Sequence, residues 1–226
     1  GQVKRKLMGC LDALQAGLAA EMAAARAENV EDLLPERVRM AQTLPQYLRI
    51  NPLQLAALDM SEASVIDDIK RHCAAAYADQ HIPHLWTLPP RTPSFATHAR
   101  VADGTVVVQD KASCFPSQVL LDTQPTGDVV DACAAPGNKT SHIAAGLFEQ
   151  AAAWNANNKN EDKKAQRQAC TVYAFDKNSR RAQLLMRRMA AAGASGVQVR
   201  CADFLAVDAE EEEQLQAVTA LLVDPS

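Results

Sequence analysis

The sequence has few aromatic residues, no long apolar run and no excess of positive charge. Aromatic residues make up 4% of the 226 residues, which disfavours an aromatic-rich β-sandwich or barrel and favours a helical or α/β protein. No apolar run approaches the roughly 18–20 residues that span a bilayer, so we predict no membrane association. The net charge of −4 means that nucleic acid binding would require a local basic patch.

Paired metal-binding or disulfide-forming motifs are also missing. The six cysteines are scattered without a Cys-x-x-Cys pair, a pattern typical of free thiols in a reducing compartment. His81 and His84 have metal-ligand spacing but lie in a proline-rich segment without a Cys or acidic partner. We therefore predict no metal site. The hydrophobic fraction of 48% excludes a disordered chain.

Residues 1–100 are expected to form a smaller, mainly helical N-terminal domain. The apolar spacing predicts a helix over residues 7–30. Alternation between two prolines predicts a short strand at Tyr47–Ile50. Residues 53–58 and 61–78 are predicted to be helical, with Ser61 as an N-cap. The prolines of His81–Arg100 predict an irregular linker.

From Val101 onward, short strands alternate with helices, which predicts a parallel sheet. We expect residues 101–226 to form a doubly wound, Rossmann-like sheet that is incomplete, with only its first four strands present. The polar residues 149–170 are interpreted as a surface insertion. The four predicted sheet strands are 129–130, 171–175, 197–199 and 221–223, a further short β-branched run lies at 106–108, and the predicted helices are 140–147 and 179–192. The last strand reads as buried, which suggests a fragment of a longer protein.

The turn after the first of the four sheet strands, 129–130, carries the most specific pattern. Val129–Thr140 runs from a strand through small residues into a helix, so that backbone amides can approach a negatively charged ligand group. Gly137 has no glycine partner at the spacing of a Walker A loop or a nicotinamide fingerprint. Both nucleotide loops, and with them an oxidoreductase, are disfavoured. The alternative is an ordinary strand–helix turn.

Three acidic residues end consecutive predicted strands, namely Asp176, Asp203 and Asp224. The carboxyl ends of parallel strands line one crevice, where ligands bind. An acid after the second strand can accept hydrogen bonds from both hydroxyls of a ribose, and an acid after the third can accept from an adenine amino group. Taken singly, each acid could equally be a helix N-cap or a solvated turn residue.

Three segments together resemble one enzyme family. They are Pro45-Gln-Tyr-Leu-Arg-Ile-Asn51, Gln109-Asp-Lys-Ala-Ser-Cys-Phe-Pro116, and Asp131-Ala-Cys-Ala-Ala-Pro-Gly-Asn-Lys-Thr140 followed by Ser-His142, with Asp224-Pro-Ser226 at the end. The sequence is similar to the SUN/Fmu family of S-adenosylmethionine-dependent RNA cytosine-5 methyltransferases. Asn138 and the trailing Ser-His resemble the eukaryotic branch that modifies large-subunit ribosomal RNA.

The resemblance implies a role for individual residues. It assigns the cofactor loop to Cys133, Ala134, Ala135, Pro136, Gly137, Asn138 and Lys139. It places Asp176 at the ribose hydroxyls, Arg181 beside the cofactor, Asp203 at the adenine, and Asp224 near the methyl group and the target cytosine. Lys139 has three open interpretations: a bond to RNA phosphate, a pair with a neighbouring carboxylate, or solvation. Lys139 and Asp224 are the catalytic candidates.

The same resemblance implies a cysteine thiolate that attacks carbon 6 of cytosine, so that carbon 5 can accept the methyl group. That cysteine and a second, releasing cysteine are expected in elements beyond Ser226, and this fragment alone is not expected to catalyse. Cys133 is expected to be a small buried residue beneath the loop and Cys114 to pack in the preceding element. A non-catalytic ribosome-assembly factor with the same fold is the alternative function.

The resemblance also implies the partners and the compartment. Ribosomal RNA or a pre-ribosomal particle is the expected partner of a monomeric protein in the nucleus or nucleolus, with the mitochondrion as the alternative. Arg180, Arg181, Arg187 and Arg188 either form a basic patch or are simply solvated on an amphipathic helix.

Overall fold

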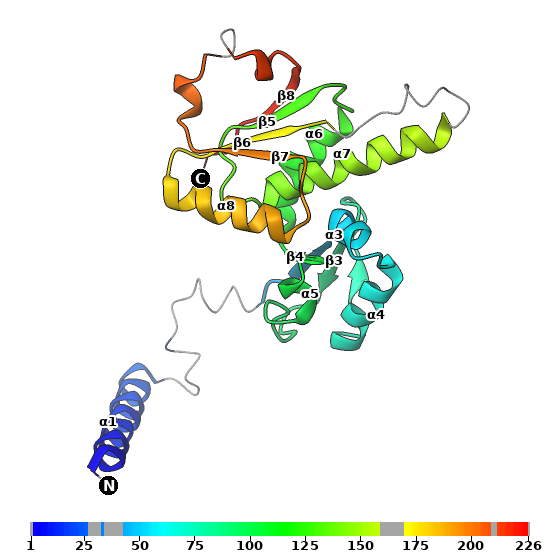
Figure 1. Ribbon diagram of the computed structural model, residues 1–226. Helices are drawn as coiled ribbons and strands as arrows, with labels where there is room; N and C mark the ends of the chain where they lie inside the picture. Colours follow the sequence, from blue (N-terminus) through cyan, green and yellow to red (C-terminus); the bar gives the residue numbers. More distant parts are fainter. Residues whose placement is uncertain (1, 27–32, 34–42, 159–169, 209–211, 226) are drawn as a thin grey trace. The chain divides into compact units, whose positions relative to one another are not determined.

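The structure is a computed structural model that describes residues 2–26, 33, 43–158, 170–208 and 212–225. It divides into two compact units, residues 1–45 and 46–226. The first unit contains the helix α1 (Gln2–Ala25), in agreement with a helical start of the chain. The ribbon of the second unit is shown in Figure 1. The boundary predicted near residue 100 stays a prediction.

The second unit begins with a small antiparallel sheet in the order β2-β3-β1-β4. Its core joins strand residues such as Leu48, Leu88 and Val106 to Val65 and Ile69 of α4. Ser61 is the N-cap of α4, as predicted, and its side chain accepts a hydrogen bond from the amide of Ser64. The elements are β1 (Gln46–Ile50), α3 (Pro52–Ala57), α4 (Glu62–His72), β2 (Tyr77–Ala78), β3 (Leu85–Leu88), α5 (Ala99–Ala102) and β4 (Val106–Val108).

Three expectations for this region were wrong. The helix predicted over residues 61–78 ends at His72, and Tyr77–Ala78 is the strand β2. Leu85–Leu88 is a buried strand inside the segment predicted to be an irregular linker, because its backbone pairs with both β1 and β2. Val106–Val108 pairs antiparallel with β1 and does not join the parallel sheet. Neither pairing is evident from the sequence, because the strands are short, one of them lies among prolines, and the partner residues are distant in the sequence.

The parallel sheet follows, in the order β7-β6-β5-β8. Strands β5, β6 and β7 are added in one direction, and the chain then crosses back to place β8 on the other side of β5. A ligand crevice is expected where the strand order reverses. The elements are α6 (Lys111–Asp122), β5 (Asp128–Asp131), α7 (Asn138–Asn157), β6 (Val172–Phe175), α8 (Ser179–Ala191), β7 (Val197–Arg200), η3 (Phe204–Ala206), η4 (Glu213–Leu215) and β8 (Val218–Leu222).

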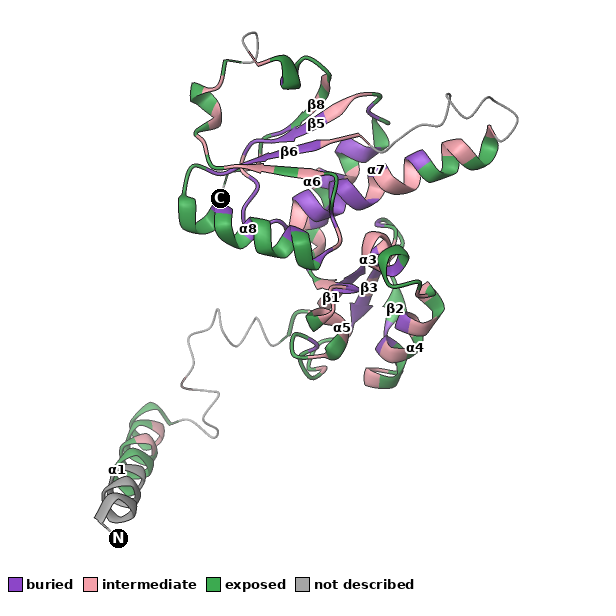
Figure 2. Cartoon of the chain, in the orientation of Figure 1, coloured by how far each residue is buried: buried purple, intermediate pink, exposed green. Residues whose placement is uncertain are grey.

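The two faces of this sheet are covered differently. Helices α6, α7 and α8 contribute Leu121, Ile143 and Leu185 to the core on one face, and Figure 2 shows buried residues concentrated on β5, β6 and the adjoining side of α7. Val130 and Phe175 on the other face pack against the segment that contains η3 and η4. The predicted α/β fold is therefore confirmed.

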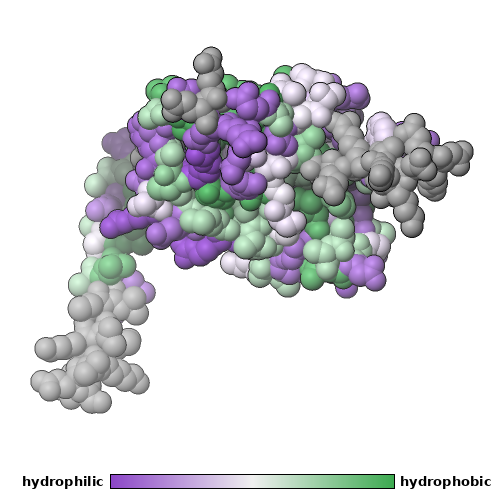
Figure 3. Space-filling model, turned by 45° about the horizontal axis from the view of Figure 1, so that its top comes forward, coloured by the Kyte–Doolittle hydropathy of each residue, from purple (hydrophilic) through white to green (hydrophobic). Residues whose placement is uncertain are grey.

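Two local features differ from the sequence-based interpretation. Helix α7 continues to Asn157, so the first part of the predicted polar insertion is helical, while residues 159–169 lie outside the described residues. Strand β8 was expected to be buried, but it lies at an edge of the described sheet, and Leu221 is 49% exposed. Hydrophilic and hydrophobic residues are intermixed on the face shown in Figure 3.

His84 connects the small sheet region to α7 through two carboxylates. Its Nδ1 lies 2.9 Å from Glu62 Oε1 on α4, and its Nε2 lies 2.9 Å from Glu149 Oε1 on α7. Hydrogen bonds to Glu149 and then to Glu62 outweigh burial and raise the pKa of His84 to about 9. The imidazolium form, which can donate from both nitrogens, is therefore favoured at neutral pH.

We predict that this bridge makes stability depend on pH in the alkaline range. Because the folded-state pKa is raised, the stabilisation is complete below pH 6.5 and is lost as pH rises through about 9. Glu62 and Glu149 are about 40% exposed, so screening by water limits the contribution to about 1 kcal/mol. Urea unfolding of the wild type should lose this amount between pH 6.5 and 9.5.

The variant His84→Asn is the comparison, because asparagine also tolerates the positive φ of 58° at this position. It should be less stable than the wild type at pH 6.5 and show no such loss at higher pH. An identical pH dependence in the two proteins would contradict the bridge.

Candidate functional site

The turn between β5 and α7 is held by the buried carboxylate of Asp131. Its Oδ2 accepts a hydrogen bond from Thr140 Oγ1 at 2.7 Å, and its Oδ1 accepts from the amide of Cys133 at 3.4 Å. Burial raises the pKa of Asp131, and the bond from Thr140 opposes this rise. A side chain at the end of the strand thus ties the start of the turn to the first turn of the helix.

Gly137 allows the turn to pass closely over α8. Its φ of 104° lies in the left-handed region, and a Cβ there would stand 2.6 Å from Met189 Cε and 2.7 Å from Leu185 Cδ1. Only glycine meets both requirements without strain or displacement. The preceding peptide bond between Ala135 and Pro136 is cis.

Asp176 follows β6 and is held by two partners. Its Oδ1 accepts a hydrogen bond from the amide of Asn178 at 2.8 Å, and its Oδ2 lies 3.3 Å from Arg181 Nε. Arg181 Nη2 also donates to the carbonyl oxygen of Ala135 at 2.7 Å. The ion pair therefore joins the end of the second parallel strand to the β5–α7 turn.

Asp203 follows β7 and caps the short helix η3. Its Oδ1 accepts a hydrogen bond from the amide of Leu205 at 3.1 Å. The alternative interpretation of this acid, as a helix N-cap, is therefore correct. Asp203 is also exposed and borders a cavity at the ends of the parallel strands. Leu205 beside it is 93% exposed, which presents an apolar side chain at the same place.

A cavity of about 400 Å³ lies at the carboxyl ends of the parallel strands. Four of the predicted site residues line it, namely Cys133, Asp176, Arg181 and Asp203. Ala132, Phe204, Val223 and Pro225 contribute apolar wall. Asp176 and Asp203 share this cavity, as expected for acids at the ends of parallel strands, whereas Asp224 does not line it. Cys133 is half-buried rather than buried, because its side chain faces this cavity and not the core.

Lys139 and Asp224 form an ion pair next to the cavity. Lys139 Nζ lies 2.7 Å from Asp224 Oδ2, and the two side chains are 27% and 39% exposed. Of the three interpretations of Lys139, the structure shows the pair with a neighbouring carboxylate. Neither residue lines the cavity, although Val223 and Pro225 on either side of Asp224 do.

The remaining turn residues do not line this cavity. Ala134 and Ala135 are buried beneath it. Gly137 and Asn138 face a second cavity of about 330 Å³, where they lie with Val107, Arg188 and Ala191. Asn138 Oδ1 accepts a hydrogen bond from Arg188 Nη1 at 3.3 Å. The turn therefore separates two hollows.

The sequence did not reveal the role of Arg49, a fully buried residue of β1. Its Nε donates to Gln109 Oε1 at 2.9 Å, and its Nη2 donates to Ser141 Oγ at 2.7 Å and to the carbonyl oxygen of Asn138 at 3.3 Å. Burial lowers the pKa of Arg49 to about 10, so the guanidinium is still charged at neutral pH. The sequence signals were an arginine within an apolar strand and the place of that strand in a segment that carries the family resemblance.

Two further ionisable side chains in the described part of the chain, Cys114 and His142, are buried in the protein. Cys114 is buried in α6, as expected, and burial raises the pKa of its thiol to about 11. Burial lowers the pKa of His142 to about 2, which keeps its imidazole neutral. Within the described ranges no three His, Cys, Asp or Glu side chains gather as a metal site, and no helix is long and apolar enough to cross a membrane.

The strand order, the small-residue turn and the acid-lined cavity define a Rossmann-like methyltransferase domain. Solved structures from Pyrococcus horikoshii share this fold. One is a methyltransferase homologue, with a TM-score of 0.52 and 20% identity over 77% of this chain and 48% of its own. Another is NSun6 with SFG, with a TM-score of 0.53 and 13% identity over 80% of this chain and 64% of its own.

Curated relatives indicate the family. The chain is 31% identical over 191 residues to the 25S rRNA (cytosine-C(5))-methyltransferase rcm1 of Schizosaccharomyces pombe, covering 81% of this chain and 36% of that protein. It is 33% identical over 211 residues to the 28S rRNA (cytosine-C(5))-methyltransferase of Mus musculus, covering 87% and 41%. No protein-family model matches. The chain is thus homologous to proteins named as rRNA cytosine-C5-methyltransferases, in agreement with its resemblance to the SUN/Fmu family.

The alignment with the Arabidopsis thaliana 25S rRNA (cytosine-C(5))-methyltransferase NSUN5 extends over the whole chain, with 29% identity. This chain covers 35% of that protein. It thus spans between about a third and two fifths of the length of the curated relatives it matches.

We predict that Arg49→Lys destabilises the protein although it preserves the charge. A lysine ammonium cannot reproduce the fork that reaches Gln109 on one side and Ser141 on the other. Buried polar groups then lose their partners, at a cost of about 2–3 kcal/mol in the free energy of unfolding. Urea denaturation followed by circular dichroism measures this change.

The exposed Arg71 of α4 provides the matched control. Arg71→Lys should change the free energy of unfolding by less than about 0.5 kcal/mol. Equal effects of the two substitutions would show that the buried fork is not needed.

Proposed function

We propose that the protein transfers a methyl group from S-adenosylmethionine to carbon 5 of a cytosine in ribosomal RNA. The observation that supports this proposal most directly is the 400 Å³ cavity, at which acids from two successive strand ends and Arg181 converge. The proposal is also supported by the relatives, which are named as rRNA cytosine-C5-methyltransferases. A nucleolar location follows as part of the proposal.

The residues at the cavity suit an adenosine-containing cofactor. Each carboxylate oxygen of Asp176 already has one partner within the protein. Each oxygen keeps a lone pair that can accept a hydrogen bond from a ribose hydroxyl. Asp203 offers a carboxylate to an adenine amino group, and the exposed Leu205 offers apolar contact to the ring. When bound, S-adenosylmethionine supplies an electrophilic methyl group on a positively charged sulfur.

In this proposal, Lys139 and Asp224 act near the methyl group that is transferred. Lys139 holds the Asp224 carboxylate in place through the ion pair of 2.7 Å, and Asp224 is then a fixed negative charge beside the cavity. Such a charge favours a positively charged sulfur and can accept a hydrogen bond from a cytosine amino group. The turn from Cys133 to Asn138, held by Asp131 and Arg181, sets the position of these groups.

The cofactor step is tested by the substitution Asp176→Asn. The substitution preserves shape but removes the charge that receives the ribose hydroxyls. A hydrogen bond to a charged group contributes about 1.5–3 kcal/mol, so affinity for S-adenosylmethionine should fall about 10- to 100-fold. Isothermal titration calorimetry on the 226-residue chain measures this affinity.

Asp67→Asn, on the exposed side of α4, removes the same charge far from the strand ends and should leave the affinity unchanged. Absence of S-adenosylmethionine binding by the wild type would reject the proposed cofactor. Equal affinity of the wild type and Asp176→Asn would reject the role of Asp176.

The reaction itself is tested in cells. Bisulfite sequencing of large-subunit ribosomal RNA should show one cytosine that is protected in the wild type and converted in a strain lacking the protein. Re-expression of the protein should restore protection, whereas re-expression of the Asp176→Asn variant should not. An unchanged methylation pattern would favour the non-catalytic assembly factor.

A further inference from the structure

Helix α8 and Lys177, which precedes it, carry a concentration of positive charge, of which only Lys177 and Arg181 line the cofactor cavity. The 13 residues of the helix include Arg180, Arg181, Arg187 and Arg188 and no acidic residue. All five of these side chains are exposed. The whole protein has a net charge of −4, so this basic surface is a local departure from the overall charge.

The four arginines form two pairs with the same spacing. Members of each pair are seven residues apart, which is nearly two helical turns, or about 10.5 Å along the axis. Arg181 and Arg188 lie on the flank toward the β5–α7 turn, where they donate to Ala135 O at 2.7 Å and Asn138 Oδ1 at 3.3 Å. These two arginines position the turn.

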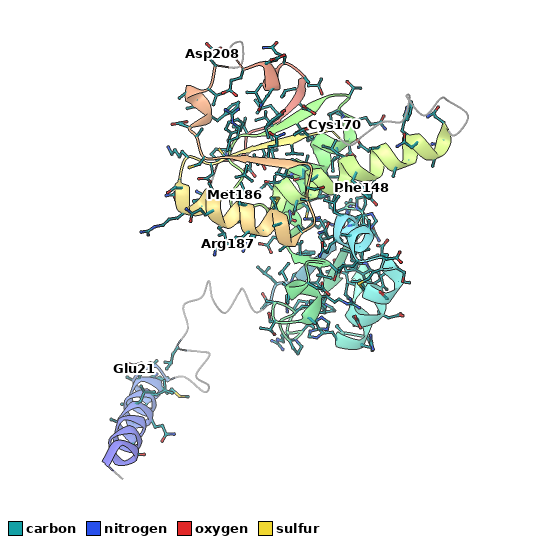
Figure 4. All side chains as sticks on the ribbon, viewed as in Figure 1. Glu21, Phe148, Cys170, Met186, Arg187 and Asp208 are labelled. Carbon is teal, nitrogen blue, oxygen red and sulfur yellow. The ribbon has the colours of Figure 1, made fainter. Side chains whose placement is uncertain are left out.

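Arg180 and Arg187 lie on the outer face of the helix. Figure 4 shows Arg187 on the side of α8 that faces away from the sheet. Within the described part of the chain, neither guanidinium has a carboxylate within ion-pair distance or a hydrogen-bond partner. Leu184, between them on the same face, is 37% exposed.

The same face adjoins the cavity of about 330 Å³ beside the turn. Arg188 and Ala191 of α8 line this cavity with Val101 and Val107 from the small sheet region. The surface thus combines a line of guanidinium groups with an apolar hollow. Guanidinium groups pair with phosphates through two parallel hydrogen bonds, and an apolar hollow accommodates a base.

We propose that the outer face of α8, defined by Arg180, Leu184 and Arg187, together with the adjoining hollow beside Arg188, binds a single-stranded segment of the RNA substrate. Arg180 and Arg187 contact successive parts of its phosphate backbone, and a base enters the hollow beside Arg188. This inference rests on the proposed function, because it assigns a surface to the RNA. Carboxylates of an acidic protein fit less well, since they make no use of the adjoining hollow.

The test measures binding of a fluorescein-labelled, 20-nucleotide single-stranded RNA of mixed sequence to the 226-residue chain by fluorescence anisotropy. The double variant Arg180→Gln/Arg187→Gln should bind about 10-fold more weakly at 0.1 M salt. The slope of log K against log salt should decrease by about 1.4, because each lost phosphate contact removes about 0.7. Affinity for S-adenosylmethionine should not change, since neither side chain contacts the turn.

The matched control is Arg71→Gln/Arg91→Gln, which removes the same charge from exposed positions in the small sheet region. It should bind the RNA within about twofold of the wild type, and thermal unfolding should show that both double variants are folded. Equal RNA affinity of the wild type and Arg180→Gln/Arg187→Gln would overturn the inference and leave the proposed function standing.

Two other outcomes are also decisive. If the wild-type chain binds S-adenosylmethionine but no RNA, the α8 surface is rejected while the cofactor step is retained. If poly-glutamate of matched charge binds as tightly as the RNA and loses the same affinity in Arg180→Gln/Arg187→Gln, the surface serves an acidic protein and the inference is wrong.

Discussion

The buried guanidinium of Arg49 is the contact on which the arrangement of the site depends. It joins β1 to Gln109 at the entry to α6 and to Asn138 and Ser141 in the first turn of α7. These residues come from the three sequence segments that carry the family resemblance. Since Arg49 is fully buried and has no carboxylate partner in this network, its charge is stabilised by neutral oxygens in fixed positions. The small sheet thereby fixes where α7 begins, and α7 fixes the turn that borders both cavities.

Sequence reasoning located the candidate site because it follows from a rule of chain topology. Asp176 and Asp203 come directly after parallel strands, and parallel strands end at one edge, so these acids had to approach one another. Arg49, Thr140 and Ser141 could not be found in this way. Arg49 and Ser141 meet although they lie 92 residues apart in the sequence, and the Thr140 hydroxyl is turned inward to Asp131. Neither periodicity nor charge encodes these contacts.

The same limit explains what was missed in the fold. The strands Leu85–Leu88 and Val106–Val108 are short, and one lies among prolines. Their stability comes from pairing with β1 rather than from local preference. Helix α7 extends through alanines into a polar stretch, where composition suggested a loop. By contrast, the long and strongly amphipathic α8 was predicted almost to its boundaries, because one apolar stripe at helical spacing is sufficient to specify it.

Helix α8 shows how one repeated residue pair can serve two sides of a helix. A spacing of seven residues returns to within about 20° of the same direction, so Arg181 and Arg188 share the flank that holds the turn while Arg180 and Arg187 share the outer face. The hydrogen bonds to Ala135 and Asn138 occupy the flank pair, and the outer charges can attract an anion without releasing the turn. Binding of an RNA backbone and positioning of the turn are thus separate functions of one rigid element, which keeps the substrate strand and the proposed methyl donor in a constant relation.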